Sequence, residues 1–240
     1  MQNAAFRALG LDWSYQLLDV PAEDLAAAIA GLRAPEVAGA NVTIPYKQAV
    51  MGHLDRLDPE ALRARAVNTI VNDGGRLEGA NTDVVAIRAA LEEVGVEPKG
   101  ARAVILGAGG SARAAAVALE GAHLAFASRH PEDADVPGQV VAWDDPALAA
   151  MTRSADVLIN ATPLGRREEM PLRPGALPAA GAVVDLVYVT GGTPLVRKAR
   201  SLGLRTADGW GILLAQGARS FELWTGRRAP ADAMRQTLQP

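Results

Sequence analysis

Hydrophobic and polar positions follow two different patterns along this chain, and the change between them falls near residue 100. Before it, short apolar stretches alternate with polar turns. A turn signal, Asp73-Gly74-Gly75, lies between two strand-like segments and predicts a β-hairpin. Beyond residue 100, continuous apolar runs such as Val104-Ile105-Leu106 are typical of parallel strands buried on both faces. The sequence therefore predicts an α/β protein with two structurally different parts.

These patterns predict the following elements. In the first part we expect helices at residues 3–9, 21–32 and 46–54, strands at 15–20 and 37–42, and the hairpin strands at 66–72 and 76–80. An amphipathic helix over 83–94 follows. In the second part we expect strands at 104–106, 123–127, 140–141, 157–159 and 183–186, a helix at 209–224 and another from about 231.

Three polar segments at the ends of these elements carry candidate chemistry: residues 41–47, 66–69 and 81–83. Together they offer the ammonium of Lys47, the carboxylate of Asp83 and the amide of Asn68. Taken singly, each has a structural explanation, as a solvated lysine, a helix N-terminal acid or a turn residue. Their joint occurrence favours a site for a small polyhydroxylated acid and a proton transfer.

Composition narrows the class of protein. The chain has 240 residues, a net charge of −3 and scattered arginines, which predicts no nucleic-acid or membrane partner. It contains no cysteine, and its three histidines share no metal-ligand spacing, so we predict neither thiol chemistry nor a metal site. No apolar stretch approaches the ~20 residues that span a bilayer, and no signal-peptide pattern is present. We therefore expect a cytoplasmic protein.

A glycine-rich turn follows the first buried strand of the second part and precedes a helix-like segment. It fits the dinucleotide fingerprint G-x-G-x-x-G/A, with the phosphates at the helix N-terminus. The first glycine permits a tight turn, and the second lets backbone amides approach a pyrophosphate. The alternative is a glycine-rich turn without a ligand. The predicted cofactor-binding residues are Gly107, Ala108, Gly109, Gly110, Ser111 and Ala112.

The end of the next strand indicates which dinucleotide is bound. Versions that bind NAD place an acid there for the ribose 2′-hydroxyl, whereas NADP versions place an arginine for the 2′-phosphate. Here the strand ends in Ser128-Arg129, and no acid occurs before Glu132. The guanidinium of Arg129 suits a phosphate, so we predict NADP, with a solvated surface arginine as the alternative.

The order of these motifs resembles the shikimate dehydrogenase family over essentially the whole chain. It runs N-V-T-I-P-x-K, A-V-N-T, N-T-D, G-A-G-G and N-A-T-P-L-G, and then Asp185-Leu186-Val187-Tyr188 and Asp208-Gly209. The resemblance implies an N-terminal α/β substrate domain and a Rossmann-type NADP-binding domain with a cleft between them. Residues 1–81, completed by 217–240, would form the first, and residues 82–216 the second.

The resemblance also implies roles for single residues. Lys47 and Asp83 match the catalytic pair, and Thr43, Asn68, Tyr188 and Gln216 match substrate-binding positions. Thr162 and Gly209 match further cofactor-binding positions. The implied reaction is the reversible NADPH-dependent reduction of 3-dehydroshikimate to shikimate, in aromatic amino-acid biosynthesis. The partner would be this small molecule, and the protein a monomer or homodimer.

Two alternatives remain open at this level. One is a relative that also acts on quinate; the other is an impaired NADP-binding protein. The second arises because family members carry a strand and a carboxylate-binding Ser-x-Ser loop before the segment matching Met1-Gln2-Asn3. We accordingly expect the natural protein to start upstream of Met1. Other departures from the family pattern are Gln2 in place of His and Ala86-Ile87 in place of Gly-Phe.

Overall fold

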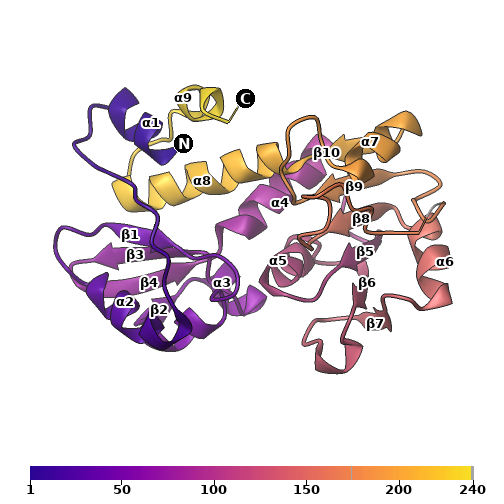
Figure 1. The fold of residues 1–240 in the computed structure, drawn as a ribbon, viewed down its shortest axis with the longest axis horizontal. Coiled ribbons are helices and arrows are strands. Elements are labelled where there is room, and N and C mark those ends of the chain that lie inside the picture. The colour runs from indigo at the N-terminus through magenta and orange to yellow at the C-terminus, as the bar shows by residue number, and fades with distance from the viewer. Residues whose placement is uncertain (174, 239–240) are drawn as a thin grey trace. The chain divides into compact units, whose positions relative to one another are not determined.

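The computed structural model describes residues 1–173 and 175–238, and its chain forms two compact units (Figure 1). Unit 1 comprises Met1–Thr82 and Leu214–Pro240, and unit 2 comprises Asp83–Leu213. The chain passes from one unit to the other near the start of helix α4 (Thr82–Glu93) and within helix α8 (Gly209–Thr225).

Unit 1 contains a small four-stranded sheet with the order β1-β3-β4-β2. The predicted hairpin is confirmed, because β3 and β4 pair antiparallel around Gly74 and Gly75, whose φ angles are 59° and 90°. A side chain is disfavoured in that conformation, which is why glycines occupy the turn. The strands are β1 (Gly39–Asn41), β2 (Arg56–Leu57), β3 (Thr69–Asp73) and β4 (Arg76–Ala80).

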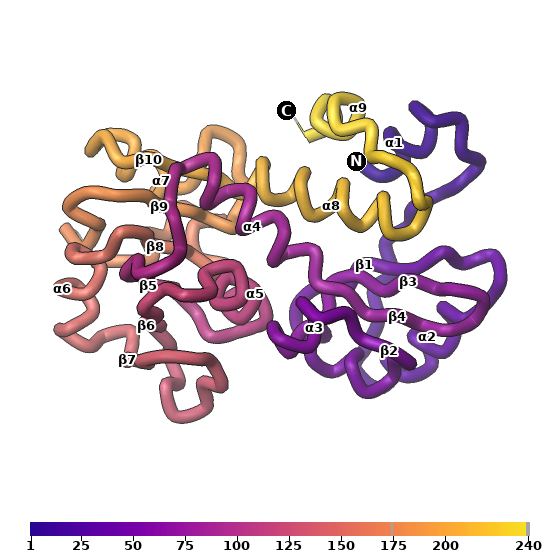
Figure 2. The backbone as a smooth tube through the Cα atoms, turned by 180° about the vertical axis from the view of Figure 1, so that it is seen from behind, coloured from indigo at the N-terminus to yellow at the C-terminus, as the bar shows by residue number. Residues whose placement is uncertain are grey.

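Helical segments cover this sheet with a core that includes Ile29, Val50 and Ile70. These segments are η1 (Ala22–Asp24), α2 (Leu25–Gly31), η2 (Ala49–His53) and α3 (Pro59–Ala64). A second core joins the two chain ends: the rings of Phe6 and Phe221 lie 5.5 Å apart, from α1 (Gln2–Ala8) and α8. Figure 2 shows α1 beside α9 (Ala231–Gln236).

Two predicted elements of unit 1 are wrong. Residues 15–20 form no strand; Leu17 and Leu18 are 91% and 71% exposed, so no buried face fixes a strand there. Residues 46–54 form only the short 3-10 segment η2, in which Val50 alone is buried. In each case tertiary burial was too small to stabilise the regular element.

Unit 2 contains a parallel six-stranded sheet with the order β10-β9-β8-β5-β6-β7 (Figure 1). Counted from β5, this is the doubly wound order 3-2-1-4-5-6, whose direction reverses between β5 and β8. Strand β10 was not predicted from the sequence. The strands are β5 (Arg102–Leu106), β6 (His123–Ser128), β7 (Gln139–Ala142), β8 (Val157–Asn160), β9 (Ala182–Asp185) and β10 (Arg205–Ala207).

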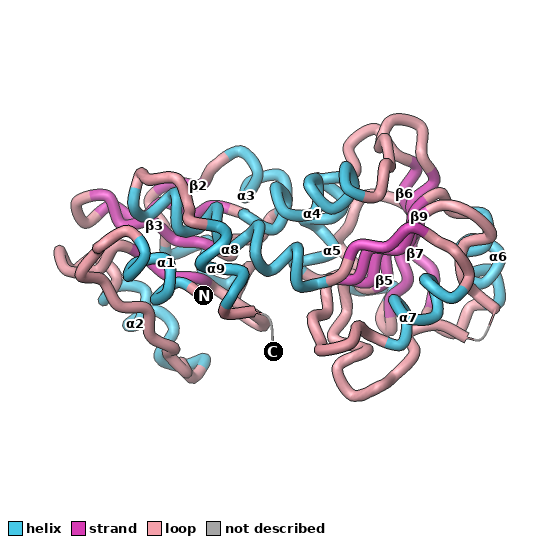
Figure 3. The backbone as a smooth tube through the Cα atoms, turned by 90° about the horizontal axis from the view of Figure 1, so that it is seen from above, coloured by secondary structure: helices cyan, strands magenta, loops and turns pink. Residues whose placement is uncertain are grey.

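Helices lie on both faces of this sheet, with α5 and α6 on opposite sides (Figure 3). Val104, Leu106 and Leu158 face a core closed by Leu148 of α6 and Leu195 of α7. The expected two-part α/β fold with a Rossmann-type sheet is therefore confirmed. The remaining elements are α5 (Gly110–Ala118), η3 (Pro131–Asp133), α6 (Pro146–Ser154) and α7 (Pro194–Ser201). None of the helices formed by residues 1–173 and 175–238 has the length and apolarity needed to span a bilayer.

Candidate active site

The glycine-rich turn lies between β5 and α5, at the point where the strand order reverses. Gly107 has a φ of 104°, and a Cβ there would lie 3.2 Å from the carbonyl oxygen of Ala161. Gly109 is the N-cap of α5 without a side-chain hydrogen bond, and a Cβ on it would meet nothing within 4 Å. The first amides of a helix lack intrahelical partners, so this turn can receive a pyrophosphate.

The loop after β8 packs directly against that turn. A Cβ on Gly107 would also lie 3.2 Å from Cγ2 of Thr162. The Thr162 hydroxyl donates to Oδ1 of Asn160 at 2.7 Å and accepts from the amide of Leu164 at 3.2 Å. Thr162 is thereby held beside the predicted phosphate-binding turn, at the topological switch point where ligands of such sheets bind.

A buried carboxylate, Asp185, connects this loop with the one after β9. Its oxygens accept hydrogen bonds from Nδ2 of Asn160 (2.9 Å), the amide of Val187 (3.0 Å) and the hydroxyl of Thr193 (2.6 Å). Asp185 is fully buried, and burial raises its pKa from 3.8 to about 6, although the three hydrogen bonds act to lower it. The two loops are therefore joined by one carboxylate.

The loop after β9 places Tyr188 next to the start of α8. A Cβ on Gly209 would lie 2.4 Å from the carbonyl carbon of Val187, so only glycine permits this close approach. The rings of Tyr188 and Trp210 lie 5.3 Å apart, and Trp210 Nε1 donates to the Val189 carbonyl at 3.1 Å. Gly209 thus holds backbone segments together, and Tyr188 remains 40% exposed.

The predicted 2′-phosphate residues lie at the end of β6. The Ser128 hydroxyl accepts from the amide of His130 at 3.1 Å, and Arg129 is exposed. Arg113 of α5 is almost buried and donates to the carbonyl of Asp135 at 2.9 Å, which anchors the far end of this loop. The position at the second strand's end is the one expected for a residue that reads the ribose substituent.

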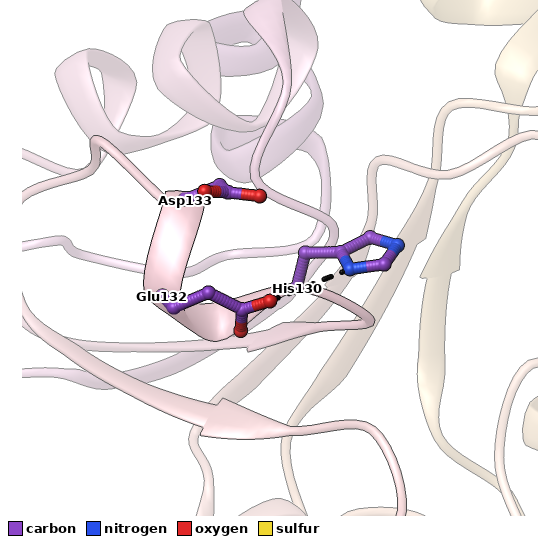
Figure 4. Close-up of side chains that lie close together, drawn as sticks. All are labelled: His130, Glu132 and Asp133. Atoms are coloured by element: carbon purple, nitrogen blue, oxygen red, sulfur yellow. Dashed lines mark ion pairs between the residues drawn. The ribbon is translucent and has the colours of Figure 1, made fainter.

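Next to Arg129, three side chains with metal-ligating atoms gather in the same loop (Figure 4). The ligand atoms of His130, Glu132 and Asp133 lie within 4.8 Å of one another, and all three residues are exposed. His130 Nδ1 lies 3.5 Å from Glu132 Oε1, which is an ion pair when the imidazole is protonated. Exposed clusters of this kind are common without a metal. We assign no metal to it.

In unit 1, residues of the three polar segments and one residue of α8 form a largely buried hydrogen-bonded group. The Asn68 side chain, 3% exposed, accepts from the amide of Thr82 at 2.8 Å and donates to its hydroxyl at 3.0 Å. Asn41 Nδ2 donates to the hydroxyls of Thr69 (3.1 Å) and Ser220 (3.0 Å). We call these five residues, Asn41, Asn68, Thr69, Thr82 and Ser220, the polar group.

Lys47, Gln216 and Asp83 are connected through the backbone to the polar group or to its neighbours in the chain, whereas Tyr188 belongs to unit 2. The Lys47 carbonyl accepts from the amide of Val67 at 2.7 Å, which ties segment 41–47 to segment 66–69, and Lys47 is half-buried. Thr43 is exposed, and Gln216, half-buried on α8, accepts through its carbonyl from the Ser220 hydroxyl at 3.0 Å. Asp83, in the first turn of α4, follows Thr82 directly.

Two parts of this arrangement were not predicted from the sequence. Ser220 belongs to the polar group although 151 residues separate it from Thr69. The one signal that could have pointed to it is Gln216, a predicted substrate-binding residue one turn earlier on α8. The Asn160–Asp185–Thr193 connection was also missed, although Asn160 and Asp185 both end apolar strands, a position that often carries site residues.

The reversed strand order, the open glycine turn and the polar group define a dinucleotide-dependent enzyme with a separate α/β unit for a polar ligand. Comparison with known proteins supplies the family. Residues 1–70 match the family model of the shikimate dehydrogenase substrate binding domain, and residues 209–239 that of the shikimate 5′-dehydrogenase C-terminal domain. The chain belongs to the shikimate dehydrogenase family, as its motifs predicted.

Individual relatives agree over nearly the whole chain. The shikimate dehydrogenase (NADP(+)) of Moorella thermoacetica is 45% identical over 100% of this chain and 87% of its own length. The structure of shikimate 5-dehydrogenase from Thermus thermophilus with NADP(H) and shikimate is 36% identical (TM-score 0.84, covering 98% of this chain and 91% of that one). A 5-ketofructose reductase of Gluconobacter sp. is also 36% identical (TM-score 0.82, 99% and 91%).

Proposed function

We propose that this protein catalyses the reversible NADPH-dependent reduction of 3-dehydroshikimate to shikimate, a step of aromatic amino-acid biosynthesis. The observation that carries the proposal is the 45% identity, over the whole chain, to a relative named for this NADP-dependent activity. The Thermus thermophilus relative with bound NADP(H) and shikimate supports the same ligands. Unit 1 would bind the substrate and unit 2 the cofactor.

The residues of unit 2 fit NADP. Gly109 leaves the N-terminus of α5 open to a pyrophosphate, and Gly107 lets the turn pack against the loop after β8, with Ala108, Gly110, Ser111 and Ala112 completing the turn. Ser128 and Arg129 would hold the 2′-phosphate, and Thr162 and Gly209 would shape the remainder of the site. When bound, the nicotinamide supplies or accepts the hydride.

Lys47 and Asp83 would carry the proton chemistry. Addition of hydride to the ketone carbon of the substrate develops negative charge on its oxygen, and a cation with a proton source beside that oxygen stabilises the transition state. Lys47 would supply this charge and the proton. Asp83 would accept a hydrogen bond from a substrate hydroxyl and orient Lys47.

The remaining substrate contacts would come from hydroxyl and amide groups. The side-chain amides of Asn68 and Gln216 would bind substrate hydroxyls, and the hydroxyls of Thr43 and Tyr188 the carboxylate. Hydrogen bonds with Thr82 hold the Asn68 amide in one orientation before substrate arrives. A group fixed in advance loses little side-chain entropy on binding, which favours its use in recognition.

The direct test is spectrophotometric, following reduction of NADP⁺ when shikimate is added to the purified protein. We expect turnover with shikimate and NADP⁺. A parallel assay with quinate shows whether this protein acts on shikimate alone or on both acids. Binding of NADP⁺ without turnover of either acid would instead favour an impaired NADP-binding protein and contradict the proposal.

Arg129→Ala tests the choice of cofactor. If its guanidinium binds the 2′-phosphate, we expect NADP⁺ binding to weaken by roughly 1.5–3 kcal/mol, as for a hydrogen bond to a charged group, with NAD⁺ binding nearly unchanged. Calorimetric titration of both cofactors measures this. Arg153→Ala, an exposed arginine of α6, is the matched control. Equal losses for NADP⁺ and NAD⁺ would show that Arg129 supports the loop and does not read the phosphate.

A further inference from the structure

A cation and two aromatic rings form a stack at the carboxyl end of the sheet in unit 2. The guanidinium carbon of Arg166 lies 5.7 Å from the centre of the Tyr188 ring, within the range of a cation–π interaction. Tyr188 in turn contacts Trp210, whose ring centre lies 5.3 Å away. Because Trp210 is itself fixed by its hydrogen bond to Val189, the stack has a rigid base.

The position of this stack in the sheet indicates which end of the dinucleotide it meets. The glycine turn follows β5, and Arg129 follows β6, on one side of the switch point. Arg166 and Tyr188 follow β8 and β9, on the other side. A dinucleotide bound across the switch point with its 2′-phosphate at Arg129 therefore has its nicotinamide end toward the stack. The substrate must meet the nicotinamide there.

The charge of Arg166 is not neutralised by a neighbouring carboxylate. Glu168 of the same loop pairs with Arg197, and the Glu169 carboxylate accepts from the amides of Gly165 (3.0 Å) and Arg167 (2.8 Å). Among residues 1–173 and 175–238, no acidic side chain forms an ion pair with Arg166. An arginine stacked on a ring can still donate from the edge of its guanidinium, in a geometry that matches a carboxylate.

We propose that Arg166, together with the Tyr188 hydroxyl, binds the carboxylate of the substrate and so makes the enzyme specific for acids over neutral ketones. This inference rests on the proposed function. The partners assigned above, Thr43 and Tyr188, are both uncharged, and a charge-assisted hydrogen bond is roughly twice as strong as a neutral one. Acidity of the substrate is not shared by every similar protein, because the Gluconobacter relative is named for 5-ketofructose, a sugar without a carboxylate.

The test compares shikimate with its neutral methyl ester in the full-length protein carrying Arg166→Gln. Loss of one charge-assisted contact should raise the KM and the Kd for shikimate by about 10–100-fold. The KM and Kd for the methyl ester and for NADP⁺ should stay within about twofold of those of the wild type. Arg166→Lys keeps the positive charge but lacks the planar guanidinium, so its Kd for shikimate should lie between those of the wild type and Arg166→Gln. Arg167→Gln, which removes the adjacent exposed arginine, should behave as wild type.

Three results would overturn the inference. An equal rise in the Kd for shikimate and for its methyl ester would show that Arg166 only supports the loop. A rise in the Kd for NADP⁺ alone would assign Arg166 to a cofactor phosphate. Wild-type Kd values for all three ligands would exclude Arg166 from the site. Kd is measured by calorimetry, independently of turnover. A wild-type protein that binds shikimate without oxidising it would contradict the proposed function alone, and one that binds no shikimate would contradict both.

Discussion

Replacing Lys47 with alanine should lower kcat by on the order of 10²–10⁴, the usual range for a positioned acid–base group. The developing charge on the substrate oxygen would lose its cation and its proton donor in one step. Binding of NADP⁺ should change little, because the proposed cofactor residues lie in unit 2. Steady-state kinetics with shikimate, together with calorimetric titration of NADP⁺, measure both quantities.

Two further variants make this prediction specific. Lys47→Met keeps most of the length of the side chain and removes its charge, so it should be as impaired as Lys47→Ala. Lys198→Ala, in helix α7, removes a lysine outside the proposed site and should keep wild-type kcat. A Lys47→Ala protein that retains most of its turnover would exclude this residue from the mechanism.

Replacing Asp185 with alanine should have the largest effect on stability, about 2–6 kcal/mol. Asn160 Nδ2 keeps a second partner, the carbonyl of Leu164 at 3.0 Å. The buried amide of Val187 and hydroxyl of Thr193 would each lose the acceptor that they have now, at about 1–3 kcal/mol per unsatisfied group. Urea unfolding followed by tryptophan fluorescence measures the change.

Asp185→Asn tests the charge of the same side chain. The folded protein holds the pKa of Asp185 at about 6, above its ordinary 3.8, because the site is buried and because Asp208 adds negative charge. Asp208 is itself paired with Arg200 at 3.2 Å. A raised carboxyl pKa means that the folded state binds the proton more tightly than the unfolded state does. The contribution of Asp185 to stability is therefore greatest below about pH 4, and it declines as the pH rises to about 6.

The side chain of Asp185→Asn has no carboxyl group and does not titrate in this pH range. The stability of the wild type relative to Asp185→Asn should accordingly fall by roughly 3 kcal/mol between about pH 4 and pH 6 and stay constant above that. Denaturation curves of both proteins across this range give the difference. If the difference does not vary with pH, Asp185 does not titrate in the folded protein as its burial requires.

Elements whose structure depends mainly on residues adjacent in the sequence could be predicted from short sequence patterns. Gly74 and Gly75 adopt positive φ angles in a turn that few other residues allow, so the hairpin was evident from its sequence. Val104, Ile105 and Leu106 form a continuous apolar run, because a parallel strand covered on both faces needs no polar side. Gly107 was also evident from the sequence, because the tight turn after β5 requires a positive φ angle that favours glycine.

Other features depend on distant partners and could not be predicted in this way. Residues 15–20 have a strand-like composition, yet a strand forms only where another strand supplies hydrogen bonds and burial, and Leu17 has neither. The two residues of β2 were missed because their strand exists only through pairing with β4. The polar group unites Thr69 with Ser220, which the sequence keeps 151 residues apart.

The sequence by itself determined the fold class, the family, the glycine-rich turn after β5 and the set of candidate site residues, because each depends on short motifs whose chemistry is local. Only the tertiary structure showed that Asp185 joins two loops, that Ser220 completes the polar group and that Arg166 lies over Tyr188. These are contacts between residues on different elements, and their hydrogen bonds, burial and charges exist only once the sheet has brought the strand ends together.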